Sequence, residues 1–307
     1  MENSGKSKIA VWISAFRLRT LALSFALIIM GTALAIQHGQ FDGVTFVLAL
    51  VTTLFLQILS NLCNDYGDTV SGVDQMERKG PARTVQSGAI TLSQMLRAMY
   101  VFGILSFLSG ILLLIQCYSR LGSTGVISLL GIGILCIVAA VTYTVGRKPY
   151  GYIGLGDLSV FIFFGLVGVM GSNFLYSGSI EPTAWLMACS IGFLSMGVLN
   201  MNNLRDADSD AKSGKRTVVV MMGKRAACVY QTILIVAALV LLALYIFLFG
   251  HWAQAICFLG AIGLLRHLVF VRKNYDNAEA LDTQLKVVSI SALLISLLFM
   301  CATVVCA

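Results

Sequence analysis

Charged residues divide this sequence into long runs that contain no Asp, Glu, Lys or Arg. Each run exceeds the roughly 20 residues that a helix needs to cross about 30 Å of hydrocarbon. With 58% hydrophobic and 11% charged residues and a mean hydropathy of +0.88, a soluble domain of 307 residues could not bury this much apolar side chain. We therefore predict an all-α, polytopic membrane protein whose spans lie in the runs 20–41, 43–64, 98–119, 121–146, 158–180, 182–204, 226–265 and 287–307.

The run 226–265 is too long for one helix. Gly250, His251 and Trp252 form a polar and interfacial break near its middle, so we predict two helices there. The total is then nine transmembrane helices in a single membrane-embedded domain, residues 1–307. An odd number of crossings places the two termini on opposite faces.

The basic residues predict which face is which. With the N-terminus in the cytoplasm, 20 of the 21 Lys and Arg residues fall on the inner side, and only Arg120 falls outside. This bias predicts a cytoplasmic N-terminus and an external C-terminus, and we expect a multi-pass protein of the bacterial inner membrane. It also explains the net charge of +7, so that charge does not indicate nucleic-acid binding. A cleaved signal peptide ending near Ala35 is the less favoured alternative for the first 36 residues.

Two acidic clusters stand at the ends of apolar runs. Asp65 and Asp68 follow the second predicted helix, and Asp206 and Asp210 follow the sixth. Even-numbered helices end on the same, cytoplasmic face, so the two clusters can converge. The connections that contain them, residues 65–94 and 203–225, are long enough to be binding loops.

The spacing of these acids favours a metal site over isolated surface charges. Asp65 and Asp68 are three residues apart and Asp206 and Asp210 are four apart, so each pair shares a face if its helix continues. Oxygen ligands in small groups suit Mg²⁺, which substrate phosphates usually complete. Solvated carboxylates are the simpler alternative for any single residue. Asn61 and Asn64 precede the first pair of aspartates and belong to the same candidate site, and Asp74 and Asp208 are further possible metal ligands.

Basic residues accompany both clusters in segments rich in glycine and hydroxyl groups. The segments are Gly80-Pro-Ala-Arg-Thr-Val-Gln-Ser-Gly88 and Ser213-Gly-Lys-Arg-Thr217, and their cations are Arg83, Lys215 and Arg216. Such a mixture suits a diphosphate clamp. A Mg²⁺–diphosphate site under a bundle of apolar helices indicates a substrate with an anionic head and a lipidic tail, such as a polyprenyl diphosphate.

Four stretches match a known family: Arg17-Leu-Arg-Thr-Leu21, Asn61 to Gly88, Gly154-Leu-Gly-Asp157 leading into Val160–Gly165, and Asn202-Asn-Leu-Arg-Asp206 through Thr217. They resemble the UbiA superfamily of intramembrane aromatic prenyltransferases, which have nine helices and two Asp-rich inner loops. Within it, the chain looks most like the 1,4-dihydroxy-2-naphthoate polyprenyltransferases of menaquinone synthesis. Two departures are Leu18 and Ala22, which replace prolines of the family's first motif, and the basic Arg147-Lys148-Pro149-Tyr150 before Gly154.

The resemblance implies roles for individual residues. Asp65, Asp68, Asp206 and Asp210 would be the catalytic metal ligands, and Asn61, Asn64, Arg83, Lys215 and Arg216 would bind the diphosphate. Arg19, Tyr143, Lys148 and Asp157 are candidates for the aromatic acceptor, although Asp157 could simply be a helix N-terminal charge. The implied reaction is Mg²⁺-dependent transfer of a polyprenyl group to 1,4-dihydroxy-2-naphthoate, with release of pyrophosphate and CO₂, to give demethylmenaquinone.

Two alternatives remain. A prenyltransferase of the same fold could use another acceptor, such as 4-hydroxybenzoate, homogentisate or a haem precursor. A transporter or cation channel would instead place ionisable residues near the bilayer midplane, whereas here the charge-free runs occupy it. The D-G-x-x-A-R signature of phosphatidyl alcohol transferases does not occur in the sequence.

Overall fold

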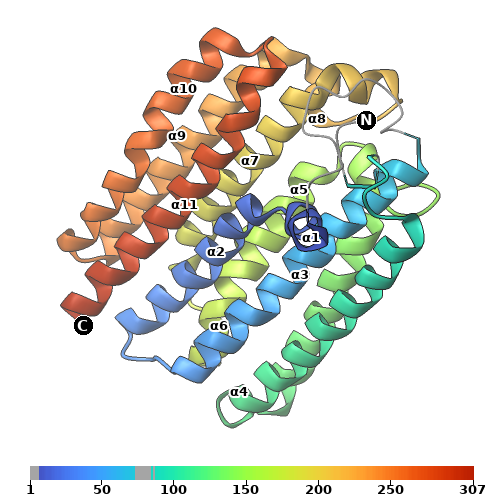
Figure 1. Ribbon diagram of the computed structural model, residues 1–307. Helices are drawn as coiled ribbons and strands as arrows, with labels where there is room; N and C mark the ends of the chain where they lie inside the picture. The colour runs from blue at the N-terminus through green and yellow to red at the C-terminus, as the bar shows by residue number, and fades with distance from the viewer. Residues whose placement is uncertain (1–6, 73–83, 86) are drawn as a thin grey trace.

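The computed structural model describes residues 7–72, 84–85 and 87–307, and these residues form helices and connections without a strand. Figure 1 shows the longer helices side by side in one bundle. The elements are α1 (Lys8–Phe16), α2 (Leu18–Gln37), α3 (Gly43–Val70), α4 (Leu92–Thr142), η2 (Tyr150–Tyr152), α5 (Gly156–Val160), η3 (Phe161–Met170), α6 (Gly171–Ser177), α7 (Ala184–Lys212), α8 (Val218–Met222), α9 (Lys224–Phe249), η4 (Trp252–Ala261), α10 (Ile262–Asn274) and α11 (Ala278–Cys306).

Eight helical segments of the described chain are long and apolar enough to cross a membrane. The prediction of a multi-pass, all-helical membrane protein is therefore confirmed. The predicted break in the run 226–265 is also confirmed, because α9 ends at Phe249 and the next helical segment begins at Trp252. α5, η3 and α6 together form a single segment, Gly156–Ser177, of which η3 is a π-helix of ten residues.

α4 has 51 residues, but its backbone is not helical at Gly122, where φ is 61°. The chain reverses there. Met95 before this point and Val141 after it pack in the same cluster as Leu62, near the end of α3. Cys117 instead lies 3.6 Å from the hydroxyl of Thr45, at the start of α3. α4 is therefore a pair of antiparallel segments, as its turn at the lower edge of Figure 1 shows.

Burial distinguishes the inner helices from the peripheral ones. The apolar window of α2 is 72% buried within the protein and that of α7 is 67% buried, whereas the window of α4 is only 6% buried. α2 packs against α11 and η3, and α7 packs against α9, α11 and η3. α2 and α7 therefore form the centre of the bundle, and the outward face of α4 is free to contact lipid.

Both acidic clusters lie on helices. α3 continues to Val70 and α7 continues to Lys212, so each helix extends beyond its charge-free run and includes its two aspartates. The connections after them are shorter than the sequence suggested, because the last turns of the helices replace part of the expected loops. At Gly67, between the α3 aspartates, the backbone approaches the carbonyl of Thr144 so closely that a Cβ atom would clash. Glycine at this position allows the segment after α4 to pack against the cluster.

Candidate active site

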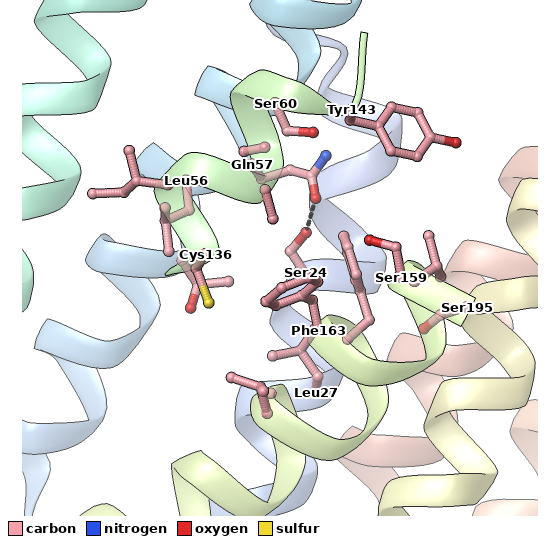
Figure 2. Close-up of a pocket in the computed structure, with 18 of the residues that line it drawn as sticks. Ser24, Leu27, Leu56, Gln57, Ser60, Cys136, Tyr143, Ser159, Phe163 and Ser195 are labelled. Atoms are coloured by element: carbon pink, nitrogen blue, oxygen red, sulfur yellow. Dashed lines mark hydrogen bonds between the residues drawn. The ribbon is translucent and has the colours of Figure 1, made fainter. Parts of the chain in front are cut away.

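A cavity of about 420 Å³ lies among α2, α3, α4, η3 and α7. One end is polar and includes Asn61, Asn64, Asp68, Asp206, Asp210 and Lys215. Away from that end the wall is mostly apolar, with residues such as Leu27, Leu56, Leu114, Leu130, Phe163 and Val167. Figure 2 shows part of this wall, with Ser60 and Tyr143 toward one end of the view and Phe163 and Leu27 toward the other. The shape therefore suits a molecule that is polar at one end and lipidic over the rest of its length.

Asp65 is buried and paired with Arg17. The side chain of Asp65 is 3% exposed, and its second oxygen accepts a hydrogen bond from Thr84 at 3.3 Å. Arg17 stands at the junction of α1 and α2 with a φ of 51°, which is unusual for a residue other than glycine. Strained backbone of this kind persists only where the surrounding structure holds it. Here it directs the Arg17 guanidinium toward Asp65 of the α3 cluster.

Asp68 and Asp210 share one cation. The ammonium of Lys215 lies 2.8 Å from Asp68 Oδ1 and 3.7 Å from Asp210 Oδ1, and it also sits 4.4 Å from the centre of the Tyr152 ring. The Tyr152 hydroxyl donates a hydrogen bond to Asp68. The prediction that the two clusters converge is met by this contact, because it joins a residue of α3 to one of α7.

Asp206 has a different partner, the neighbouring Arg205. The Arg205 guanidinium donates to both carboxylate oxygens of Asp206, at 2.8 and 2.7 Å. It also donates to Asp282 of α11 at 2.6 Å and to the Asn202 side chain at 2.8 Å. With its side chain only 1% exposed, Arg205 fixes Asp206 relative to α11.

The two asparagines of the α3 cluster lie on the cavity wall but differ in their contacts. The Asn61 amide nitrogen donates to the Phe16 carbonyl and the Thr20 hydroxyl, both at 2.9 Å, and its oxygen accepts from Gln57. Gln57 in turn accepts from Ser24 at 2.6 Å, as Figure 2 shows. Asn61 therefore joins α3 to the α1–α2 junction. Asn64 accepts from the Thr144 hydroxyl at 3.2 Å.

Two other predicted ligands, Arg216 and Asp208, do not reach the cavity. The Arg216 side chain is exposed, and its backbone nitrogen donates to the Tyr152 carbonyl. Asp208 is also exposed and pairs with Lys224 at 2.8 Å. Asp74 and Arg83 lie outside the described residues, as does the side chain of Arg19.

Of the three acceptor candidates whose side chains the structure describes, Tyr143 lies on the cavity wall. Asp157 is buried beside the cavity, where it accepts a hydrogen bond from Tyr230 at 3.1 Å, and Lys148 is exposed. The structure therefore brings Tyr143 to the site and leaves Asp157 and Lys148 off its wall.

The carboxylates fit a cation in chemistry and orientation. Within the described part of the chain, no three His, Cys, Asp or Glu side chains lie close enough together to form a metal site. However, Asp68 and Asp210 already point at one shared cation, the Lys215 ammonium, from opposite helices. Oxygen donors in this arrangement are the type that Mg²⁺ prefers.

Sequence reasoning did not assign roles to four residues that contact the clusters: Arg17, Tyr152, Arg205 and Asp282. Arg17 and Arg205 belong to the motifs that resemble the family, and that was the available signal. Tyr152 lies 84 positions from Asp68, to which it donates a hydrogen bond. Asp282 lies 76 positions from Asp206 and supports it through Arg205. Nothing in their local sequence marks them as part of the site.

Comparison with known proteins agrees with these features. Residues 23–304 match the model of the UbiA prenyltransferase family. A 1,4-dihydroxy-2-naphthoate octaprenyltransferase of Escherichia coli K12 is 44% identical over 295 residues, which are 95% of this chain and 94% of that protein.

Solved structures share the fold. A UbiA homologue from Aeropyrum pernix K1 superposes with a TM-score of 0.69 at 18% identity, covering 93% of this chain and 98% of the other. A UbiA homologue from Archaeoglobus fulgidus, bound to DMAPP and Mg²⁺, has a TM-score of 0.60 at 16% identity and covers 94% and 99%. The chain belongs to the UbiA prenyltransferase family.

Proposed function

We propose that this protein transfers a polyprenyl group from polyprenyl diphosphate to 1,4-dihydroxy-2-naphthoate in menaquinone biosynthesis, forming demethylmenaquinol, the reduced form of demethylmenaquinone. The observation that supports it most is the 44% identity, over 95% of the chain, to an enzyme named for this reaction. The cavity supports the same conclusion independently, because a polar, carboxylate-rich end continues into an apolar wall.

The polar end would hold the diphosphate of the donor. Asp68, Asp206 and Asp210 on the wall, with the adjacent Asp65, are the proposed Mg²⁺ ligands, and an Archaeoglobus homologue was solved with this ion. Bound Mg²⁺ would neutralise the charge that develops on the departing pyrophosphate. Lys215 would pair with a phosphate oxygen, and the position of its ammonium between Asp68 and Asp210 supports this role.

The rest of the cavity would keep the reacting carbons away from water. The C–O bond to the diphosphate breaks, and an electron-rich ring carbon of the acceptor forms the new C–C bond. The acceptor's carboxylate leaves that carbon as CO₂ and returns its bonding electrons to the ring. The aromatic ring of Tyr143 on the wall is suited to stabilise positive charge on the allylic fragment.

We also propose the topology in the membrane. Counting α4 as two crossings gives nine, with the N-terminus in the cytoplasm, the C-terminus outside and the site at the cytoplasmic face of a bacterial inner membrane. The distribution of basic residues supports this orientation, as does the position of both acidic clusters at helix ends on one side. Reporter fusions after Gly122 and after Ala307 should both be external. A cytoplasmic reporter at either position would contradict the topology.

The function is tested by mass spectrometry of the product. Purified protein with Mg²⁺ and octaprenyl diphosphate is offered 1,4-dihydroxy-2-naphthoate, 4-hydroxybenzoate or homogentisate in separate reactions. We expect octaprenyl transfer to the naphthoate, with one CO₂ for each pyrophosphate. Transfer to 4-hydroxybenzoate or homogentisate, but not to the naphthoate, would contradict the proposed acceptor.

A further inference from the structure

Two glycines of the cavity wall face open space. A Cβ atom built at Gly133 of α4, or at Gly171 at the start of α6, meets no atom within 4 Å apart from its chain neighbours and the adjacent backbone of its own helix. Gly168, also on the wall, differs because its Cβ would lie 2.7 Å from the Leu27 side chain. Close helix packing therefore explains Gly168, whereas Gly133 and Gly171 leave part of the cavity unfilled.

The segments that contain these glycines are joined at two levels. The Tyr150 hydroxyl donates to the Ala139 carbonyl at 2.9 Å and lies 3.0 Å from the Ser159 hydroxyl, so Ala139 and Ser159 lie at one level near the polar end. At the far end, a Cβ built on Gly125 would lie 3.5 Å from the Phe174 ring. Between these levels both segments line the cavity, as Cys136 and Phe163 illustrate in Figure 2.

The bridging contacts allow the depth of each glycine to be compared. Gly133 is six residues from Ala139, or about 9 Å along the helix axis. In the antiparallel segment, Phe174 is level with Gly125, which is fourteen residues, or about 21 Å, from Ala139. Gly171 is three residues, or about 4.5 Å, nearer the polar end than Phe174. Gly171 therefore lies about twice as far from the polar end as Gly133.

We propose that Gly133 and Gly171 determine which prenyl chain lengths the enzyme accepts, by leaving room for the tail at two depths of the cavity. A larger side chain at Gly133 would obstruct all but short tails. The same change at Gly171 would obstruct only tails that extend farther. This inference rests on the proposed function, since it requires a prenyl diphosphate with its head at the polar end.

The experiment compares kcat/KM for geranyl, farnesyl and octaprenyl diphosphate, with 1,4-dihydroxy-2-naphthoate as acceptor. Gly131→Leu is the matched control, because Gly131 is on the same helix, is exposed and is not on the cavity wall. We expect Gly133→Leu to lower the octaprenyl-to-geranyl ratio by at least about tenfold, because an obstructing side chain discriminates by size. Gly171→Leu should lower the octaprenyl rate but leave the farnesyl-to-geranyl ratio unchanged, and Gly131→Leu should match the wild type.

Gly133→Ala and Gly133→Val provide a graded series in case the leucine variant does not fold, and the ratio should fall as side-chain volume rises. Wild-type ratios across the Gly133 series, or an equal loss in Gly131→Leu, would overturn this inference alone. A wild-type protein that transfers no prenyl group from any of the three donors would overturn the proposed function and the inference together.

Discussion

The acidic clusters of α3 and α7 have the same composition but are neutralised differently. Asp65 pairs with Arg17, which comes from a junction 48 positions earlier in the chain, whereas Asp206 pairs with the adjacent Arg205. The remaining members, Asp68 and Asp210, both contact Lys215. By sequence spacing, the aspartates form one pair on α3 and one pair on α7. In the structure, Lys215 joins Asp68 of the first pair to Asp210 of the second.

This difference indicates how much each cluster depends on the rest of the fold. Asp206 is held by Arg205, which also pairs with Asp282 of α11, so the α7 cluster is fixed by contacts between α7 and α11. Asp65 depends on the α1–α2 junction, which Asn61 ties to α3 through Phe16 and Thr20. We therefore expect changes at the junction to affect the α3 cluster alone.

The largest loss of activity should follow from neutralising either aspartate of the shared contact. Asp68→Asn and Asp210→Asn should each lower kcat by about a thousandfold, because each removes a negative charge that, in the proposed function, holds the Mg²⁺ and the diphosphate. Asp208→Asn is the control, since Asp208 is exposed and pairs with Lys224 outside the cavity. Prenyl transfer at saturating substrate is the measurement. Near-wild-type kcat in either of the first two variants would remove that residue from the site.

A smaller loss is expected at the cation between the clusters. Lys215→Met should lower kcat/KM by about a hundredfold, because in the proposed function the ammonium pairs with phosphate oxygens. Arg216→Met tests the neighbouring cation, whose side chain is exposed, and we expect it to lose less than about threefold. Equal losses in these two variants would contradict the assignment of the diphosphate contact to Lys215.

Removing Arg17 should have a moderate effect that is confined to the α3 cluster. Arg17→Met leaves Asp65 without its guanidinium, and we expect kcat/KM to fall about tenfold and the free energy of unfolding to fall by about 3 kcal/mol. The double variant Arg17→Met with Asp65→Asn should regain much of that stability, because it leaves no such buried charge. Thermal unfolding of purified protein in detergent compares the stability of the single and the double variant with that of the wild type, and a prenyl-transfer assay gives kcat/KM. If the second substitution restored no stability, the Arg17–Asp65 pair would not explain the loss.

The smallest effect should come from the anchor on α11. Asp282→Asn removes the negative charge of one partner of Arg205 but leaves the contacts with Asp206 and Asn202, so kcat/KM should fall only about threefold. The conservative Asp282→Glu should restore part of this loss. A loss as large as that of Asp210→Asn would instead indicate that Asp282 takes part in the site directly.

The spans of this fold could be predicted because charged residues are costly in the bilayer, so charge-free runs mark the helices. The same patterns placed Asp68 and Asp210 on one face, which their shared contact with Lys215 agrees with. The partners of the aspartates could not be predicted, since Tyr152 and Asp282 reach them only through tertiary packing. The acceptor candidates show the same limit: Tyr143 lies on the cavity wall, but Lys148, five positions later, is exposed. The π-helical backbone of η3 also has no marker in its apolar sequence.

The central claim, that the α3 and α7 clusters form one site, is tested most directly by a double-mutant cycle on Asp68 and Asp210. The kcat for octaprenyl transfer to 1,4-dihydroxy-2-naphthoate is measured for both single Asn variants and for the double variant. Groups that act as a unit give strongly non-additive losses, so we expect the double variant to lose little more than the worse single variant. A loss equal to the product of the two single losses would show that the clusters act independently, and would contradict a shared site.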